Sequence, residues 1–118
     1  MTDTLQISVD SQKESAVMHL QGRVDIESSP DFRDHLIVTL RRQPPPETIT
    51  IDLKDISYMD TSGIATLIEG LKIARIGNIS MYLQGLHGHL LHLFQATGLG
   101  SLFDLDGPAT KLSTPTVS

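Results

Sequence analysis

The residues best suited to chemistry in this chain are three consecutive polar ones, Asp60, Thr61 and Ser62. A hydroxyl there can accept a phosphoryl group, attack as a nucleophile if a base lies close, or cap a helix. Composition alone favours the cap, because Asp, Ser and Thr are the ordinary capping residues. No histidine adjoins the hydroxyls in sequence, although one distant in sequence could lie close in space. A phosphate cradle is not predicted, because a glycine-rich loop and a suitably placed lysine are both absent.

The flanking elements place these hydroxyls at the start of a helix. Residues 48–53 alternate polar and apolar side chains and are rich in β-branched types, which predicts a strand. A helix over about 61–75 follows, since apolar residues recur at helical spacing; they are Ile64, Leu67, Ile68 and Leu71. The first N–H groups of a helix lack partners and its macrodipole is positive there, so an added negative group can be accommodated. We therefore expect the function at this turn.

The rest of the chain continues the alternation of strands and helices. Further strands are expected over residues 5–9, 16–20 and 79–83, and further helices over about 30–40 and 90–98. Ser29 is the expected N-cap of the first helix, with Pro30 at its first position. Gly22 indicates a bulge or a close backbone approach, and the short apolar segment 99–105 is expected to be an edge strand.

This order of elements predicts an α/β domain. Its sheet should be mixed and four- to five-stranded, with an N-terminal hairpin, a mostly parallel remainder and helices packed against it. Right-handed crossovers would bring the Asp60 turn to the carboxyl edge, where open α/β sheets generally place their sites. The domain is expected to span residues 1–106, and residues 107–118, dominated by Pro, Thr and Ser, to be a disordered tail.

Composition narrows the class of protein. The 118 residues include no cysteine, which excludes disulfides and thiolate metal sites. A net charge of −5 with scattered basic residues argues against nucleic-acid binding, because phosphate contacts need clustered positive charge. The N-terminus has no signal-peptide pattern, and no apolar run is long enough for a bilayer. A soluble, cytoplasmic protein without membrane insertion is expected.

Two further features of the sequence leave alternatives open. A projection of the second helix puts Arg75 on the same side as its apolar stripe, which should be buried. The opposite face carries Ser62, Thr66, Glu69, Ile73 and Ile76. The two isoleucines of that face either form a partner-binding surface or are covered by a neighbouring loop or the tail. Gly70 within this helix indicates close packing against another element.

The histidines offer little chemistry. His89 and His92 have the spacing of two ligands on one helical face, but no further histidine lies nearby, so a structural or surface role is expected. The carboxylates form no obvious acid–base pair. We therefore expect no catalytic residue, no metal site, no cofactor and no enzymatic activity.

Three segments resemble the signature elements of one protein family, the STAS domain. Tyr58–Ile64 is similar to the segment of bacterial anti-sigma factor antagonists in which Asp precedes a phosphorylatable Ser or Thr, a second hydroxyl residue, Gly and an aliphatic residue. Gly22–Asp25 resembles the family's Gly-x-aliphatic-Asp element, and Leu93–Leu99 its Leu-Phe-x-x-x-Gly-Leu segment. The ordered matches span residues 5–105.

The resemblance implies a partner-switching role. In that family the unmodified antagonist binds an anti-sigma factor, which is also a Ser/Thr kinase with a histidine-kinase-like ATPase fold, and so frees the sigma factor. Phosphorylation by this kinase ends the binding, and a PP2C-type phosphatase restores it. Carried over, Thr61 is the phosphorylation site and Ser62 the second candidate. The expected partner-binding residues are Asp25, Asp60, Thr61, Ser62, Gly63, Glu69 and Ile73.

The family includes a second kind of protein with the same Asp-Thr opening. These are small subunits of bacterial lipid-transport ABC systems, in which the Thr contacts the ATPase. The resemblance therefore leaves an alternative function for this chain.

Overall fold

The computed structural model describes residues 4–102, and strands and helices alternate through this part of the chain. The elements are β1 (Gln6–Ser11), β2 (Ser15–Val24), α1 (Ser29–Leu40), β3 (Thr48–Met59), α2 (Thr61–Ile76), β4 (Ser80–Gln84), α3 (Gly88–Thr97) and the 3₁₀ helix η1 (Leu99–Leu102). The expected domain limit at residue 106 and the expected tail lie outside the described residues.

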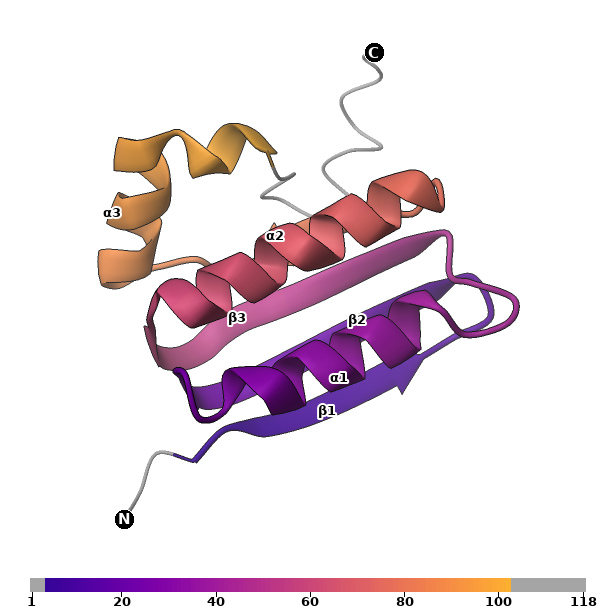
Figure 1. The fold of residues 1–118 in the computed structure, drawn as a ribbon, viewed down its shortest axis with the longest axis horizontal. Coiled ribbons are helices and arrows are strands. Elements are labelled where there is room, and N and C mark those ends of the chain that lie inside the picture. Colours follow the sequence, from indigo (N-terminus) through magenta and orange to yellow (C-terminus); the bar gives the residue numbers. More distant parts are fainter. Residues whose placement is uncertain (1–3, 103–118) are drawn as a thin grey trace.

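The strands form one mixed sheet in the order β1-β2-β3-β4. β1 pairs antiparallel with β2, and the pairs β2–β3 and β3–β4 are parallel. This topology confirms the predicted α/β class, with an N-terminal hairpin and a parallel remainder. Helices α1 and α2 run side by side across one face of the sheet and begin at the same edge (Figure 1).

The expected edge strand over 99–105 is wrong for its described part, because residues 99–102 form η1. Gly98 ends α3 in the left-handed region, with φ of 76°. The backbone N–H of Ser101 then donates to the Gly98 carbonyl at 3.1 Å, and the Ser101 hydroxyl donates to it at 2.8 Å. These bonds close a tight turn that an extended strand could not make. Residues 103–105 lie outside the described residues.

β3 extends to Met59, well beyond the predicted limit at Leu53. Its buried apolar residues are two apart up to Leu53 and then three apart, at Ile56 and Met59. The pairing with β2 shifts register twice over this stretch, and each shift leaves one extra residue in β3. The second shift lies opposite Gly22, which has φ of 106°, so the expected irregularity there is confirmed. Strict alternation, on which the prediction depended, is lost at these bulges.

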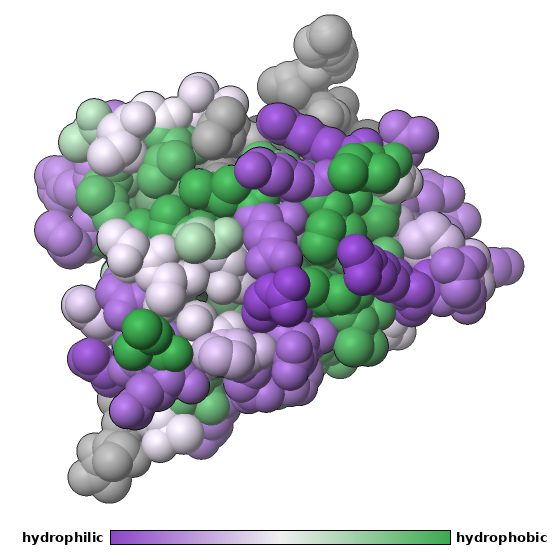
Figure 2. Space-filling view, viewed as in Figure 1, coloured by the Kyte–Doolittle hydropathy of each residue, from purple (hydrophilic) through white to green (hydrophobic). Residues whose placement is uncertain are grey.

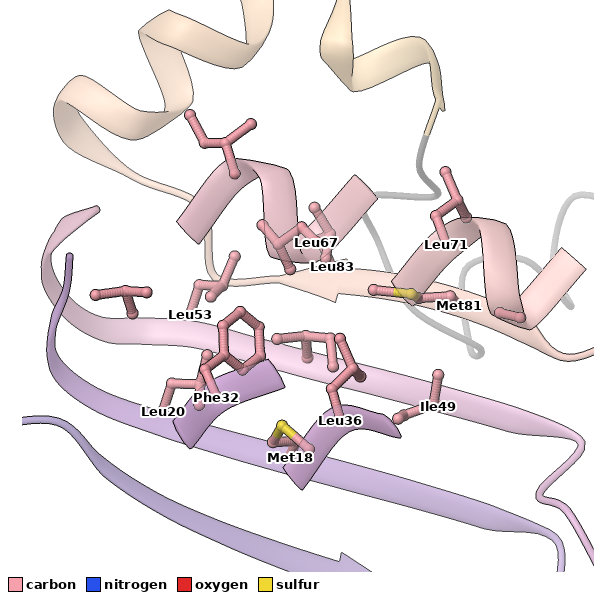
Figure 3. Close-up of a cluster of buried hydrophobic side chains, with 14 of the residues drawn as sticks. Met18, Leu20, Phe32, Leu36, Ile49, Leu53, Leu67, Leu71, Met81 and Leu83 are labelled. Carbon is pink, nitrogen blue, oxygen red and sulfur yellow. The ribbon is translucent and has the colours of Figure 1, made fainter. Parts of the chain in front are cut away.

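The core lies between the sheet and the two helices (Figure 3). Phe32 and Leu36 of α1 point toward Met18 and Leu20 of β2, and all four side chains are buried. Leu67 of α2 is buried in the same cluster. Within residues 4–102, no helix is long and apolar enough to cross a membrane.

Two details of the helices differ from expectation. Ser28, not Ser29, is the N-cap of α1, because the N–H groups of Ser28 and Ser29 both donate to the Asp25 carbonyl and lead the turn into the helix. Thr66 is buried, although the helical projection placed it on the open face of α2. Its hydroxyl donates to the Ser62 carbonyl at 3.0 Å, so its burial leaves no polar group unpaired.

The far end of α2 also corrects the projection. Arg75, expected on the buried side, is exposed. Ile73 is half-buried and packs against the core, whereas Ile76 remains 87% exposed. Of the two isoleucines, only Ile76 therefore presents a largely open apolar surface.

Gly70 lets α2 approach α1 closely, as predicted. A Cβ at this position would lie 2.5 Å from Cδ2 of Leu36, which is itself 1% exposed and held in the core. The Gly70→Val variant should therefore lose about 2–3 kcal/mol of unfolding free energy through overpacking, measured by chemical denaturation. Gly77→Ala is the matched control, because its Cβ would meet only ordinary contacts of 3.6 Å or more. Equal stability of the two variants would contradict this account of the α1–α2 contact.

Candidate functional site

The candidate site lies where β2 and β3 end at the same edge of the sheet. Val24 pairs with Met59 at the last position of each strand, and the backbone N–H of Asp60 donates to the Val24 carbonyl at 3.1 Å. α2 begins at the next residue, Thr61. The predicted strand-to-helix turn at the carboxyl edge is therefore confirmed.

Asp60 is the N-cap of α2 and holds its first turn. One carboxylate oxygen, Oδ1, accepts the backbone N–H of Ser62 at 2.9 Å and the Ser62 hydroxyl at 2.5 Å. The Ser62 hydroxyl lowers the pKa of Asp60 most strongly. Burial opposes this as the second-largest effect, and the backbone N–H groups of Ser62, Gly63 and Ile26 lower the pKa further, so that it lies below its ordinary value. The carboxylate is therefore ionised at neutral pH, beside the positive end of the helix dipole.

The two hydroxyls of the turn differ in availability. Ser62 is half-buried and its hydroxyl is committed to Asp60. Thr61 is exposed, and its hydroxyl makes no hydrogen bond within the described part of the chain. An incoming phosphoryl donor would therefore meet Thr61 first, and it would reach Ser62 only by breaking the cap.

Asp25 organises the loop beside this turn. Its Oδ1 accepts the backbone N–H groups of Glu27 and Ser28, each at 3.1 Å, and the backbone N–H of Asp25 donates to the Ser28 hydroxyl at 3.0 Å. This closed turn presents Ile26 to solvent, 76% exposed, while the Ile26 backbone interacts with the Asp60 carboxylate. Sequence reasoning missed Ile26, although an apolar residue within the polar run from Asp25 to Ser29 was the available signal.

A second pair of side chains borders the site on the strands. The Arg23 guanidinium lies over the Tyr58 ring, 4.3 Å from its centroid, and Arg23 Nε is 3.8 Å from Asp25 Oδ2. Tyr58 is 43% exposed. The edge thus presents an aromatic ring and an aliphatic side chain close to the acidic residues, and sequence reasoning had assigned neither to the site.

The remaining predicted partner-binding residues lie at different positions along α2. Gly63 is buried, and a Cβ there would lie 2.5 Å from Met59 Cγ, so this glycine lets the first turn pack on β3. Glu69 lies two turns further on and forms a two-pronged ion pair with Arg33 of α1, at 2.8 and 2.7 Å. Ile73 lies another turn away. The structure brings Asp25, Asp60 and Thr61 together at one edge, and it does not bring Glu69 or Ile73 there.

Other titratable groups do not form a catalytic set. His19 Nδ1 lies 2.9 Å from Asp52 Oδ2, and Lys54 Nζ lies 2.8 Å from the same oxygen. Burial would raise the pKa of Asp52, but the bonds from Lys54 and His19 outweigh it and lower that pKa. These residues pair in mid-sheet, away from the carboxyl edge. Within residues 4–102, no three His, Asp or Glu side chains are grouped to hold a metal ion.

A family model described as "Mlab, STAS domain" matches residues 7–105 of the chain. The protein belongs to the STAS domain family. The three segments that carry the resemblance lie at the end of β2, at the β3–α2 turn, and from α3 into the start of η1. The family match covers nearly the whole described chain.

Several relatives of this STAS domain are named anti-sigma factor antagonists. The anti-sigma-B factor antagonist of Bacillus subtilis is 30% identical over 101 residues, which are 86% of this chain and 90% of that protein. An anti-sigma factor antagonist from Mycobacterium paratuberculosis superposes with a TM-score of 0.75 at 16% identity, over 94% of this chain and 93% of the other. The Bacillus cell fate determinant SpoIIAA in its phosphorylated form superposes with a TM-score of 0.68 at 19% identity, over 93% and 97%.

The cap geometry predicts a measurable shift in acidity. Replacing Ser62 with Ala removes the bond that lowers the Asp60 pKa most, so this pKa should rise toward the ordinary value of about 3.9, as followed by carboxyl NMR titration. The ionised Asp60 stabilises the fold above its unfolded pKa, and this contribution is lost as pH falls through the folded pKa. The stability difference between wild type and Ser62→Ala should therefore narrow in acid.

Thr61→Ala is the matched control for this titration, since the Thr61 hydroxyl makes no bond to Asp60. An unchanged Asp60 pKa in Ser62→Ala, or an equal rise in both variants, would contradict the proposed geometry of the cap.

Proposed function

We propose that this protein is an anti-sigma factor antagonist whose binding to an anti-sigma factor is ended by phosphorylation of Thr61. The observation that carries the proposal is the free, exposed Thr61 hydroxyl directly after the capping Asp60, at the first position of α2. It occurs in a chain that is 30% identical to an anti-sigma-B factor antagonist over most of both proteins. Ser62 is the less suitable acceptor, because its hydroxyl supports the cap.

The proposed switch changes the charge of the surface and leaves the fold intact. A phosphoryl group adds about −1.5 to −2 charges at neutral pH. The N–H groups of Ser62, Gly63 and Ile64 already donate to Asp60, so the helix start offers the phosphate few free donors. The phosphate would stay at the surface beside an ionised carboxylate, where an acidic partner surface would repel it and its desolvation would be costly. The Thr61 side chain is exposed and is not part of the core, so its modification would not disturb the packing.

The proposed partner is an anti-sigma factor with a histidine-kinase-like ATPase fold, which would also phosphorylate Thr61. A PP2C-type phosphatase would remove the group and restore binding. Both would act in the cytoplasm on a domain that binds and does not catalyse. The proposed binding surface includes Thr61 and six further residues: Asp25, Asp60, Ser62, Gly63, Glu69 and Ile73. Asp25 would contribute through the turn that presents Ile26.

A second candidate function keeps the same Asp60–Thr61 pair. A small STAS subunit of a lipid-transport ABC system would use Thr61 to contact the ATPase and would need no phosphate. The names of the relatives favour the antagonist. Co-purification with an ABC ATPase, without transfer of phosphate, would favour the subunit.

The acceptor can be tested with the candidate anti-sigma kinase encoded near this gene. Incubation with that kinase and ATP should add one phosphoryl group to the wild type and to Ser62→Ala, and none to Thr61→Val, as measured by intact mass. Thr61→Val is the matched control because it keeps the side-chain shape without the hydroxyl, and it should still bind the kinase. Phosphate found on Ser62 would overturn the assignment of the acceptor.

Binding should respond to charge at the same residue. The Thr61→Glu variant should bind the kinase at least about tenfold more weakly, which corresponds to roughly 1.4 kcal/mol. Because Thr61 is exposed, its unfolding temperature should change by less than about 4 °C. Calorimetric titration and thermal unfolding measure the two effects. A large loss of stability without a binding defect would contradict a switch based on charge.

Ile26 should contribute strongly to the same interface. Its exposed side chain lies on the turn beside Asp60, and burying it against a partner would remove a large apolar group from water. Ile26→Ser should therefore weaken kinase binding about tenfold or more, by calorimetric titration, without lowering the unfolding temperature. Ile76→Ser, at the opposite end of α2 and 87% exposed, is the control and should bind normally. The reverse result would move the interface to the other end of α2.

A further inference from the structure

An apolar groove runs between α1 and β1, distant from the Thr61 turn. Within β1, Ile7, Val9 and Ser11 pair with buried residues of β2 and therefore face the helix layer. The layer ends at α1, however, and no other described helix covers β1 (Figure 1). Val9 is 36% exposed and Val38 of α1 is 70% exposed. The groove is lined by Val9, Ser11, Asp34, His35, Val38, Thr39 and Arg42.

Opposite charges stand at the two ends of this groove. Asp34 lies one turn before Val38 on α1, about 6 Å away along the helix axis, whereas Arg42 follows two residues after the helix ends at Leu40. Neither forms an ion pair within residues 4–102. Arg42 is nevertheless fixed in place, because its guanidinium donates to the Ser11 hydroxyl and to the carbonyls of Lys13 and Pro44. These acceptors are neutral, so the positive charge at this end remains uncompensated.

The hydrophobic side chains on this face of the molecule gather mainly between elements. Figure 2 shows them between α2 and α3 and in the gap between α1 and α2, with hydrophilic residues around them. The groove on the β1 side of α1 differs from these gaps because charged residues of opposite sign terminate it. That arrangement restricts what could bind there.

We propose that this groove binds a second copy of the chain, with the two α1 helices antiparallel about a two-fold axis at Val38. Such an axis places Asp34 of each copy against Arg42 of the other, and the two Val38 side chains meet at the centre. The acidic residue within α1 and the basic residue just beyond its end thus pair with their copies only when the two helices are antiparallel. The helix dipoles of the two α1 helices would also oppose each other favourably.

A second copy also completes the helix layer. In this arrangement, α1 of each copy would lie over β1 of the other and cover Val9, which the chain alone leaves partly exposed. An isologous contact of this kind is closed, so it predicts a dimer and no larger assembly. The contact does not involve the Thr61 turn, so it stands or falls independently of the proposed phosphorylation.

The dimer is tested first with the unmodified full chain. Sedimentation equilibrium over a roughly 100-fold range of concentration should show the mass rising from the monomer to twice that value and no further. Val38→Asp should remain a monomer throughout that range. Because Val38 is 70% exposed, the unfolding temperature of Val38→Asp should equal that of the wild type at a concentration where the wild type is monomeric, which separates loss of the contact from loss of the fold. A wild type that stays monomeric, or a Val38→Asp variant that still dimerises, would overturn the proposal.

Charge reversal tests the antiparallel pairing itself. With Asp34→Arg alone, both contacts between positions 34 and 42 would join two positive charges. With Arg42→Asp alone, both contacts would join two negative charges. Each variant should therefore be monomeric by itself. Mixed together, the two variants restore opposite charges at both contacts and should form a mixed dimer, detected by fluorescence transfer between labelled chains. Thermal unfolding of each variant shows whether it is folded. Failure of two folded variants to associate on mixing would reject the antiparallel arrangement.

Discussion

The carboxylate of Asp60 is the constraint on which the site depends. It accepts the backbone N–H and the hydroxyl of Ser62, while the backbone N–H of Asp60 donates to the Val24 carbonyl at the end of β2. One residue therefore joins the ends of two strands and the start of a helix. Because Ser62 is engaged in this cap, the neighbouring hydroxyl of Thr61 is left free at the surface. The Asp60 cap thus binds the Ser62 hydroxyl and leaves the Thr61 hydroxyl accessible.

The surface around this cap combines permanent charge with apolar groups. Asp25 uses its carboxylate to close a turn, and the turn holds Ile26 out in solvent. Arg23 stacks on Tyr58 at the adjacent strand ends. A STAS domain with this edge can gain binding energy from apolar burial while an added negative charge opposes the same contact. In the proposed switch the effect would stay local, because Thr61 is exposed and adding a charge there requires no element to refold.

Much of this arrangement could be predicted from sequence, because it depends on local patterns. The strand-to-helix handover at Asp60, the hairpin, the parallel remainder and the close approach at Gly70 all follow from alternation, helical spacing and capping chemistry. The end of β3 could not be predicted, since two bulges replace alternation by spacing of three. The 3₁₀ helix η1 could not be predicted either. Its apolar sequence is typical of a strand, but hydrogen bonds from Ser101 to the Gly98 carbonyl fold the segment into a turn. The pairing of Glu69 with Arg33 joins residues far apart in sequence, which local patterns do not contain. Ile26 differs, because a local turn at Asp25 presents it and its signal was available in the sequence.

The two extra residues in β3 have a consequence for how this family can change length. Each extra residue lengthens the interval between inward-facing side chains from two residues to three, so Leu53, Ile56 and Met59 all face the core. Deleting Ser57 alone would shorten the interval before Met59 to two residues, the ordinary spacing of a strand, and would keep Met59 opposite Val24 and Asp60 beside the Val24 carbonyl. A single deletion between Ile49 and Leu53, where the strand has no extra residue, would instead turn the side chains on one side of the deletion to the opposite face. Changes of length should therefore be tolerated at the bulges and selected against in the regular part of the strand.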